Sequence, residues 1–287
     1  MRRIVHPGPS SSDRVRTVDC RLRHLRQALA PGKSLLESLA VLLEAHGATS
    51  AVATLAGGSF APFVFLMPAL SPTPEHAVYY SARHEPEGPV RLENATITLG
   101  RRDGRPWLHC HGTWRDAQGR RLGGHVLPDE AMVKDAIEAD IWLLDGAGFE
   151  VVANPETAFT LFEPVATGDR ASAGAGGSFA MTIRPNEDLC TALVDECRAR
   201  GIARARVRGG VGSLVGARFD DGREVEPFVT EVFIREGSVG PGPDGMLEAR
   251  LDVCLVDYLG GLNEGRLLAG ANGVLVTFEL VVEPATA

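Results

Sequence analysis

Three of the eight histidines fall within one short stretch, Trp107 to Val126, and their spacing favours a shared site. Alternating apolar and polar residues predict two strands here, and the run D-A-Q-G-R between them predicts a turn. Because side chains two apart in a strand point to the same side, His109 and His111 project together, about 6 to 7 Å apart. If the turn is centred on Gln118, His125 lies directly opposite His111, with the two Cβ atoms about 4.5 to 5.5 Å apart.

Three imidazoles that converge in this way have the donor set of a metal site with coordination positions left for water or substrate. Zinc is the metal we expect first, although iron, nickel and copper also bind three histidines. The alternative is that His109 and His111 lie on the solvated face of a hairpin and that His125 is an ordinary residue at a strand end. A slip of one residue in the register would send His125 to the other face.

Length and composition set the broad class of the protein. With 287 residues and 44% hydrophobic content, the chain can build two domains, each with a core. Its net charge of −8 works against binding to a polyanion. The sequence shows no signal peptide and no apolar run long enough to cross a membrane, so we expect a cytoplasmic protein without a membrane partner. The five cysteines have no C-x-x-C spacing, so we expect neither a disulfide framework nor a zinc ribbon.

The elements that would position the histidines can be placed along the chain. Residues 1 to 17 are rich in Pro, Ser and Arg and are expected to form a loosely held tail, followed by an arginine-bearing edge strand. Pro31 to Gly47 predicts a helix that begins with a capping box, Ser34 and Glu37. Further strands are expected at 50–55, 63–67, 78–81, 95–99, 137–144 and 149–152.

The second part of the chain repeats the first. A shift of 154 residues aligns Pro31 to Phe65 with Pro185 to Phe219 without a gap, with nine identities in thirty-five positions. We therefore expect two α+β domains, residues 18–165 and a degenerate second copy at 178–287. The Gly-rich run at 166–177 is the expected linker between them.

The repeat provides an internal control for the histidines. In the alignment His109, His111 and His125 become Asp252, Cys254 and Ala271. The second copy keeps the pattern of the fold without the three imidazoles, so the histidines are not needed to make the fold. We interpret the second half as a structural or substrate-shaping partner.

These motifs together resemble the PPC domain, the "plants and prokaryotes conserved" family. The likeness is carried by P-G-x-x-L at the helix, G-G-S after it, H-x-H ending at His111, D-x-x-G at Asp116, and G-G-H ending at His125. The resemblance implies an α+β fold in which a mainly antiparallel sheet packs with one prominent helix in each repeat. It also implies assembly as a homo-oligomer, commonly a trimer, and a metal bound by His109, His111 and His125.

One hypothesis for function is a metal-dependent hydrolase or lyase acting on a small polar molecule. A metal on three imidazoles acidifies a bound water and polarises a carbonyl, and a nearby carboxylate would act as the base. Arg83 and His84 are candidates for binding an anionic substrate, since arginine pairs bidentately with carboxylates. No catalytic residue can be assigned, because the local carboxylates cannot be ranked: Asp116, Asp129, Glu130, Glu138 and Asp140.

Two other hypotheses belong to different classes. DNA binding or regulation follows from the label that the PPC family often carries, but the acidic balance and the two lysines of the chain argue against it. The one string similar to an AT-hook, Gly104-Arg105-Pro106, lies between two predicted strands and is expected to form a turn. The third hypothesis is a metal-stabilised structural or sensing module without turnover, which a closed coordination sphere would favour.

Overall fold

The structure is a computed structural model that describes residues 1–168 and 177–285. That part of the chain contains two helices, α1 (Leu35–Ala45) and α2 (Leu189–Ala199), and is otherwise rich in strands. The strands are β1 Val15–Leu29, β2 Ala51–Ala56, β3 Ser59–Phe60, β4 Phe65–Leu66, β5 Pro68–Leu70, β6 Val78–Tyr80, β7 Val90–Arg102, β8 Arg105–Arg115, β9 Arg121–Val126, β10 Val133–Asp135, β11 Ile137–Asp145, β12 Ala147–Ala153, β13 Thr160–Ala166, β14 Ser178–Ile183, β15 Ala205–Arg218, β16 Glu224–Pro241, β17 Leu247–Asp257, β18 Leu262–Arg266 and β19 Val274–Pro284.

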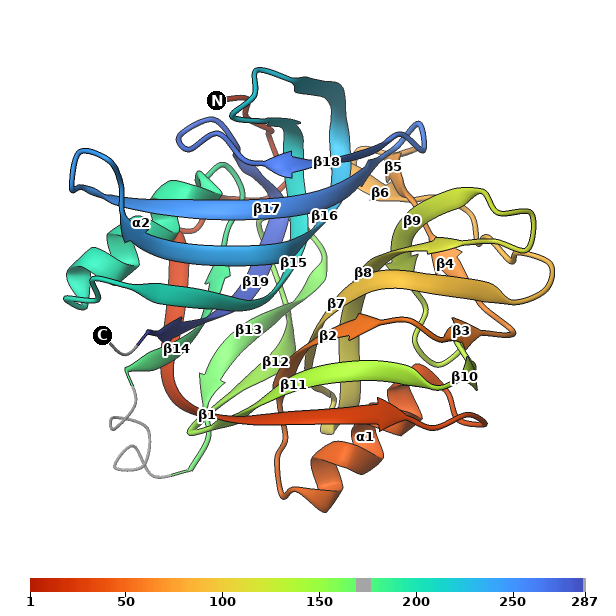
Figure 1. The fold of residues 1–287 in the computed structure, drawn as a ribbon. Coiled ribbons are helices and arrows are strands. Elements are labelled where there is room, and N and C mark those ends of the chain that lie inside the picture. Colours follow the sequence, from red (N-terminus) through yellow and green to blue (C-terminus); the bar gives the residue numbers. More distant parts are fainter. Residues whose placement is uncertain (169–176, 286–287) are drawn as a thin grey trace.

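Strand pairing is antiparallel almost throughout, as the sequence predicts, with one parallel bridge between β7 and β12. Within the first half the pairing runs β1-β11-β2-β7-β8-β9, and within the second half β14-β19-β15-β16-β17-β18. The two orders match strand for strand. Figure 1 shows the two sheets lying side by side, with the long strand β1 turning from one into the other.

Strand β1 belongs to both sheets. Its first part, Val15 to Cys20, pairs with β14, and its second part, Arg21 to Leu29, pairs with β11. The strand therefore runs through residue 18, where the sequence places the start of the first domain. Of the expected linker 166–177, residues 169–176 lie outside the described residues.

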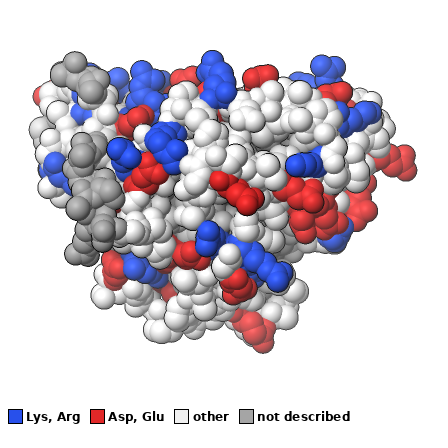
Figure 2. Space-filling view, turned by 90° about the horizontal axis from the view of Figure 1, so that it is seen from below, with Lys and Arg blue, Asp and Glu red and all other residues white. Residues whose placement is uncertain are grey.

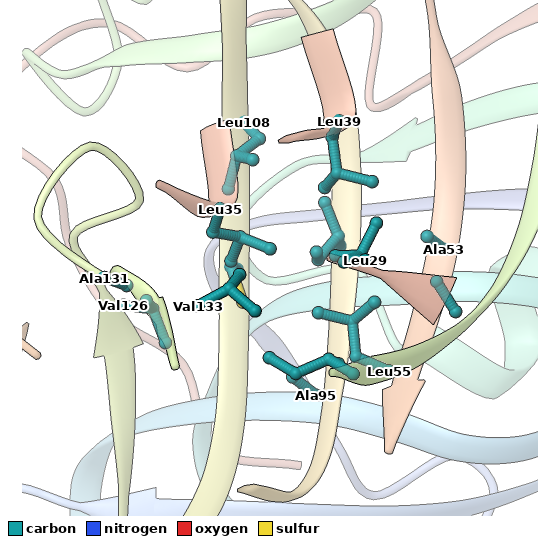
Figure 3. Close-up of a cluster of buried hydrophobic side chains, with 14 of the residues drawn as sticks. Leu29, Leu35, Leu39, Ala53, Leu55, Ala95, Leu108, Val126, Ala131 and Val133 are labelled. Carbon is teal, nitrogen blue, oxygen red and sulfur yellow. The ribbon is translucent and has the colours of Figure 1, made fainter. Parts of the chain in front are cut away.

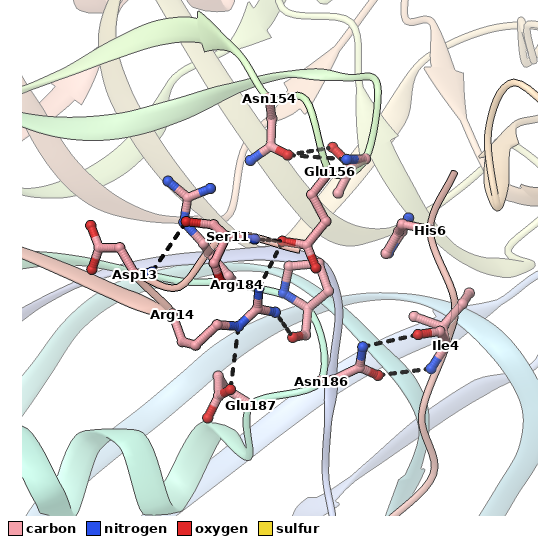
Figure 4. Close-up of polar contacts among 12 residues, drawn as sticks. Ile4, His6, Ser11, Asp13, Arg14, Asn154, Glu156, Arg184, Asn186 and Glu187 are labelled. Atoms are coloured by element: carbon pink, nitrogen blue, oxygen red, sulfur yellow. Dashed lines mark hydrogen bonds and ion pairs between the residues drawn. The ribbon is translucent and has the colours of Figure 1, made fainter. Parts of the chain in front are cut away.

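The expectation of a loosely held N-terminal tail is wrong. The backbone of Ile4 exchanges two hydrogen bonds with the side chain of Asn186, at 2.8 and 2.9 Å. The ring of His6 is buried and bonds the carbonyl of Leu275 at 2.7 Å. Arg14 donates to the buried carboxylate of Glu156 at 2.7 Å (Figure 4). These partners lie far away in the sequence, so composition alone could not reveal them.

Helix α1 begins at the predicted capping box. The amide of Glu37 donates to Ser34 Oγ at 3.1 Å, and the amide of Ser34 donates to Glu37 Oε2 at 2.9 Å. The apolar face of the helix contributes Leu35 and Leu39 to a buried cluster that also holds Leu55, Ala95 and Leu108 from the sheet (Figure 3).

The cap gives a first test of the fold. Ser34→Ala removes the acceptor for one helix-end amide and is expected to lower the free energy of unfolding by about 1 kcal/mol. Urea denaturation measures the change. Ser38→Ala is the matched control, because Ser38 lies inside the same helix and its hydroxyl has no hydrogen-bond partner among the described residues. An equal loss in both variants would contradict the role of the cap.

Candidate metal centre

The histidine hairpin forms with the predicted register. Strand β8 pairs with β9 so that His111 lies opposite His125, and His109 lies two residues before His111 in β8, on the same face. The turn is held by Asp116, whose carboxylate accepts hydrogen bonds from the amides of Gln118 and Arg120 at 3.0 and 2.9 Å. Hydrogen bonds from a side chain to backbone amides two and four residues later in the chain stabilise a tight turn. The turn then sets the register of the two strands that it joins.

The three imidazoles converge on one point. His109 Nε2 lies 3.0 Å from His111 Nε2, and His111 Nε2 lies 3.2 Å from His125 Nδ1. All three candidate ligand atoms lie within 4.8 Å of one another. The two shorter distances are close to the spacing of nitrogens that share one ion, because atoms about 2.1 Å from an ion at a tetrahedral angle are about 3.4 Å apart.

The second half of the chain orients two of these rings. His109 Nδ1 lies 3.0 Å from Glu279 Oε2 on β19, and His111 Nδ1 lies 3.0 Å from the carbonyl oxygen of Val232 on β16. Both partners accept hydrogen bonds, so each ring carries a proton on Nδ1, and the Nε2 atoms of the two rings face each other. Metal-binding histidines commonly donate their second nitrogen to a carboxylate or a backbone carbonyl in this way.

Burial keeps two of the rings neutral. It lowers the pKa of His111 well below its usual value, and the neighbouring imidazoles add to the effect. Burial lowers the pKa of His125 to about 3, with a further contribution from His109. Neutral imidazoles keep the lone pairs that a metal ion needs. Ligand nitrogens of two histidines that bind one ion lie close together, as the Nε2 atoms of His109 and His111 do at 3.0 Å, so the ring arrangement fits a bound metal.

A buried carboxylate of the second half lies beside the histidines. Glu231 Oε1 on β16 is 3.7 Å from His111 Nε2 and 3.9 Å from His125 Nδ1. The Glu231 side chain is almost fully enclosed, and burial raises its pKa well above the usual value. Its other oxygen, Oε2, has no hydrogen-bond partner among the described residues.

The centre opens into a cavity of about 390 Å³ that both halves line. Its walls are aromatic and hydroxylated, and the three histidines lie on one side of it. Representative lining residues are Tyr80, Trp107, Phe159, Thr230, Glu231 and Glu279. The ring of Tyr80 packs 5.1 Å from that of His125, centroid to centroid. A cavity of this size admits a small molecule and places it next to the imidazoles.

The structure places the expected substrate residues elsewhere. Arg83 is half exposed and pairs with Glu130 and Glu85, at 2.8 and 3.2 Å. The ring of His84 stacks on Phe65, with centroids 4.9 Å apart. Neither Arg83 nor His84 lines the cavity as the described residues define it, so their role in binding substrate stays a prediction.

The carboxylates near the hairpin in sequence have other partners. Asp116 holds the turn, Glu130 pairs with Arg83, and Asp140 pairs with Arg26 at 2.9 Å. The carboxylates at the site are Glu231 and Glu279, which sequence reasoning missed. Each is the one charged residue within a short stretch that is otherwise apolar apart from a threonine, F-V-T-E-V-F-I and T-F-E-L-V-V. A charge in a strand that is buried on both faces was the signal that could have found them.

In the second half, the residue that lies opposite Cys254 and so corresponds to His125 of the first half is not the one that the sequence alignment predicts. Cys254 on β17 lies opposite Glu264 on β18, whereas the alignment puts Ala271 there. Glu264 forms ion pairs with Arg235 and with Arg121 of the first half. At the position where the first half places its histidines, the second half therefore has a carboxylate, Glu264. The guanidinium of Arg121 from the first half forms an ion pair with it. The strand β18 ends at Arg266, earlier than the alignment assumed.

The features related to DNA binding are weak. Of the string similar to an AT-hook, only Gly104 lies in the tight turn between β7 and β8, where Asp103 and Gly104 have positive φ, and Arg105 and Pro106 are the first residues of β8. Figure 2 shows basic and acidic side chains mixed across one face of the molecule instead of a continuous basic surface. Neither of the two helices in the described residues is long and apolar enough to cross a membrane.

Comparison with known proteins finds likeness only among solved structures. No family model matches the chain, and none of the curated proteins does. The chain is similar to a plant- and prokaryote-conserved (PPC) protein from Pyrococcus horikoshii, with 17% identity and a TM-score of 0.41 over 52% of this chain and 96% of that one. A metal-containing protein from Archaeoglobus fulgidus matches with 19% identity and a TM-score of 0.43, over 51% and 97%.

A third similar structure comes from Ralstonia eutropha JMP134 and is named as a candidate DNA-binding protein. It matches with 19% identity and a TM-score of 0.38, over 48% of this chain and 89% of its own. Each of these proteins corresponds to about half of the present chain.

Proposed function

We propose that this protein is a metal-dependent enzyme, a hydrolase or lyase, that acts on a small polar molecule. His109, His111 and His125 hold the divalent metal, with zinc the first expectation. The observation that carries the proposal is the convergence of three imidazole nitrogens, two of them 3.0 Å apart, in the wall of a cavity of about 390 Å³. The three histidines form the donor set of a divalent metal, and the cavity has room for a small substrate beside them.

The residues of the chain prepare this chemistry. When bound, the metal would polarise a carbonyl and acidify a water molecule. Glu279 and the carbonyl of Val232 hold two imidazoles in the tautomer that presents Nε2 to the ion. The aromatic walls, with Tyr80 and Trp107 among them, exclude bulk water and so strengthen electrostatic interactions with the substrate.

The two halves are, in this proposal, PPC-like repeats that build one site together. Helix α2 begins and ends 154 residues after α1, at 189 and 199 against 35 and 45, and the strand orders agree. This supports the domain limits 18–165 and 178–287 on either side of the 166–177 linker. The second repeat has lost its own imidazoles and supplies partners to those of the first. Assembly as a trimer stays a prediction.

DNA binding is the alternative, and a cavity of about 630 Å³ lined by six arginines is its best support. Four of those arginines already pair with carboxylates: Arg208 with Glu283, Arg235 with Glu264, Arg250 with Glu248, and Arg266 with Asp252. Their charge is therefore largely neutralised within the protein, and we favour the enzyme.

Metal content tests the proposal. Protein purified without a histidine tag is expected to carry about one equivalent of a divalent metal by elemental analysis, and the double variant His109→Ala, His111→Ala none. His24→Ala is the control, because His24 is an exposed histidine paired with Asp140 away from the site. It should retain the metal. Native protein that remains metal-free after incubation with zinc, iron or nickel would remove the enzyme proposal and favour DNA binding.

A further inference from the structure

We propose that Glu231 of the second half is a fourth protein ligand of the metal, so that the centre is shared between the two halves of the chain. This inference rests on the proposed function. It assigns to the second half a direct role at the ion, beyond orienting the histidines, and defines the ligand set as three imidazoles and one carboxylate.

The distances favour direct contact with the ion. Glu231 Oε1 lies 3.7 and 3.9 Å from the ligand nitrogens of His111 and His125. Two ligands of one ion, each about 2.1 Å from it at a tetrahedral angle, are about 3.4 Å apart. A water molecule between the ion and the carboxylate would instead place that oxygen about 5 Å from the nitrogens, given usual metal–oxygen and hydrogen-bond lengths. The observed spacing is close to the first arrangement.

Burial gives an independent argument. A carboxylate taken out of water needs a cation or hydrogen-bond donors, and an isolated one is costly. The only ion-pair contacts of Glu231 among the described residues are those with His111 and His125, at 3.7 and 3.9 Å, which is longer than a hydrogen bond. Its Oε2 is buried and has no hydrogen-bond partner there either. A metal ion bound by the histidines would supply the positive charge that a buried carboxylate needs.

The charges also balance. Glu231 and Glu279 are two buried acidic side chains beside the imidazoles, and one divalent ion would compensate both carboxylates. With four protein ligands, the ion keeps open coordination positions only if it binds five or six ligands in total. Zinc does so on occasion, and iron, nickel and manganese do so readily. The cavity beside the centre would then supply water and substrate to those positions.

Cobalt(II) titration of the metal-free protein tests this inference, because its visible spectrum reports the ligand set and its affinity is measured in the same experiment. Loss of groups outside the ligand set costs 10- to 100-fold in metal affinity, so loss of a direct ligand should cost about 100-fold or more. Glu231→Gln is expected to show that loss and a changed cobalt spectrum. Glu236→Gln, an exposed carboxylate on the same strand, should match the native protein.

The possible outcomes separate this inference from the proposed function. If native protein binds cobalt and Glu231→Gln binds it with the same affinity and spectrum, Glu231 is not a ligand, yet the three-histidine site stands. If native protein binds no metal, both fail. Thermal unfolding of the metal-free variants checks the fold. Should Glu231→Gln not fold, Glu231→Asp keeps the charge, withdraws the carboxylate by one carbon, and is expected to weaken binding and alter the spectrum.

Discussion

Trp114→Ala is expected to lower the free energy of unfolding by about 3 to 5 kcal/mol, as for other large side chains removed from a core. Trp114 is fully buried on β8 and packs edge-on against Phe63 and Phe65, with ring centroids 4.7 and 4.8 Å apart. It lies three residues after His111 in the same strand, on the opposite face. The indole therefore fixes the histidine strand to the first core, and urea denaturation measures what it contributes.

Trp107→Ala is the matched control for that experiment. Trp107 lies on the same strand but is only partly buried, at the cavity, where Arg102 lies 5.2 Å from its ring. Less apolar area is removed from water there, so the loss should be clearly smaller. Equal losses in the two variants would show that the stability of β8 does not depend on the Trp114 side of the strand.

The hairpin was predictable because its determinants are local. The alternation of apolar and polar residues determines which side chains of β8 and β9 share a face. The turn at Asp116, held by contacts within five residues of sequence, sets the register. The pairing of His111 with His125 follows from these two facts alone. The capping box of α1 was found for the same reason, since Ser34 and Glu37 are three residues apart.

The residues that sequence reasoning missed are those whose partners are distant. Glu279 is 170 positions from His109, and the carbonyl of Val232 is 121 positions from His111. No local pattern joins such positions, because the packing of one sheet against the other brings them together. The N-terminal tail was misjudged for the same reason, since Asn186 and Leu275 hold it. In the second repeat a different turn length moved Glu264 into the place assigned to Ala271.

Glu279→Gln is expected to lower metal affinity by about 10- to 100-fold, the usual cost of removing a carboxylate that orients a ligating histidine. Glu279 is fully buried on β19 and accepts the Nδ1 proton of His109 at 3.0 Å. An amide in its place can turn its NH₂ group toward Nδ1, which would favour the tautomer that carries the proton on Nε2, where the metal must bind. Competition with a chelator of known affinity measures the change.

The cobalt spectrum should distinguish this variant from Glu231→Gln. Because Glu279 contacts the ring and not the ion, the ligand set of Glu279→Gln is unchanged, so its spectrum should keep the native form while its affinity falls. Glu283→Gln is the control on the same strand, since Glu283 pairs with Arg208 at 2.7 Å away from the histidines. Native affinity in Glu279→Gln would mean that the carboxylate does not set the tautomer of His109. The second repeat would then act on the metal through β16 alone.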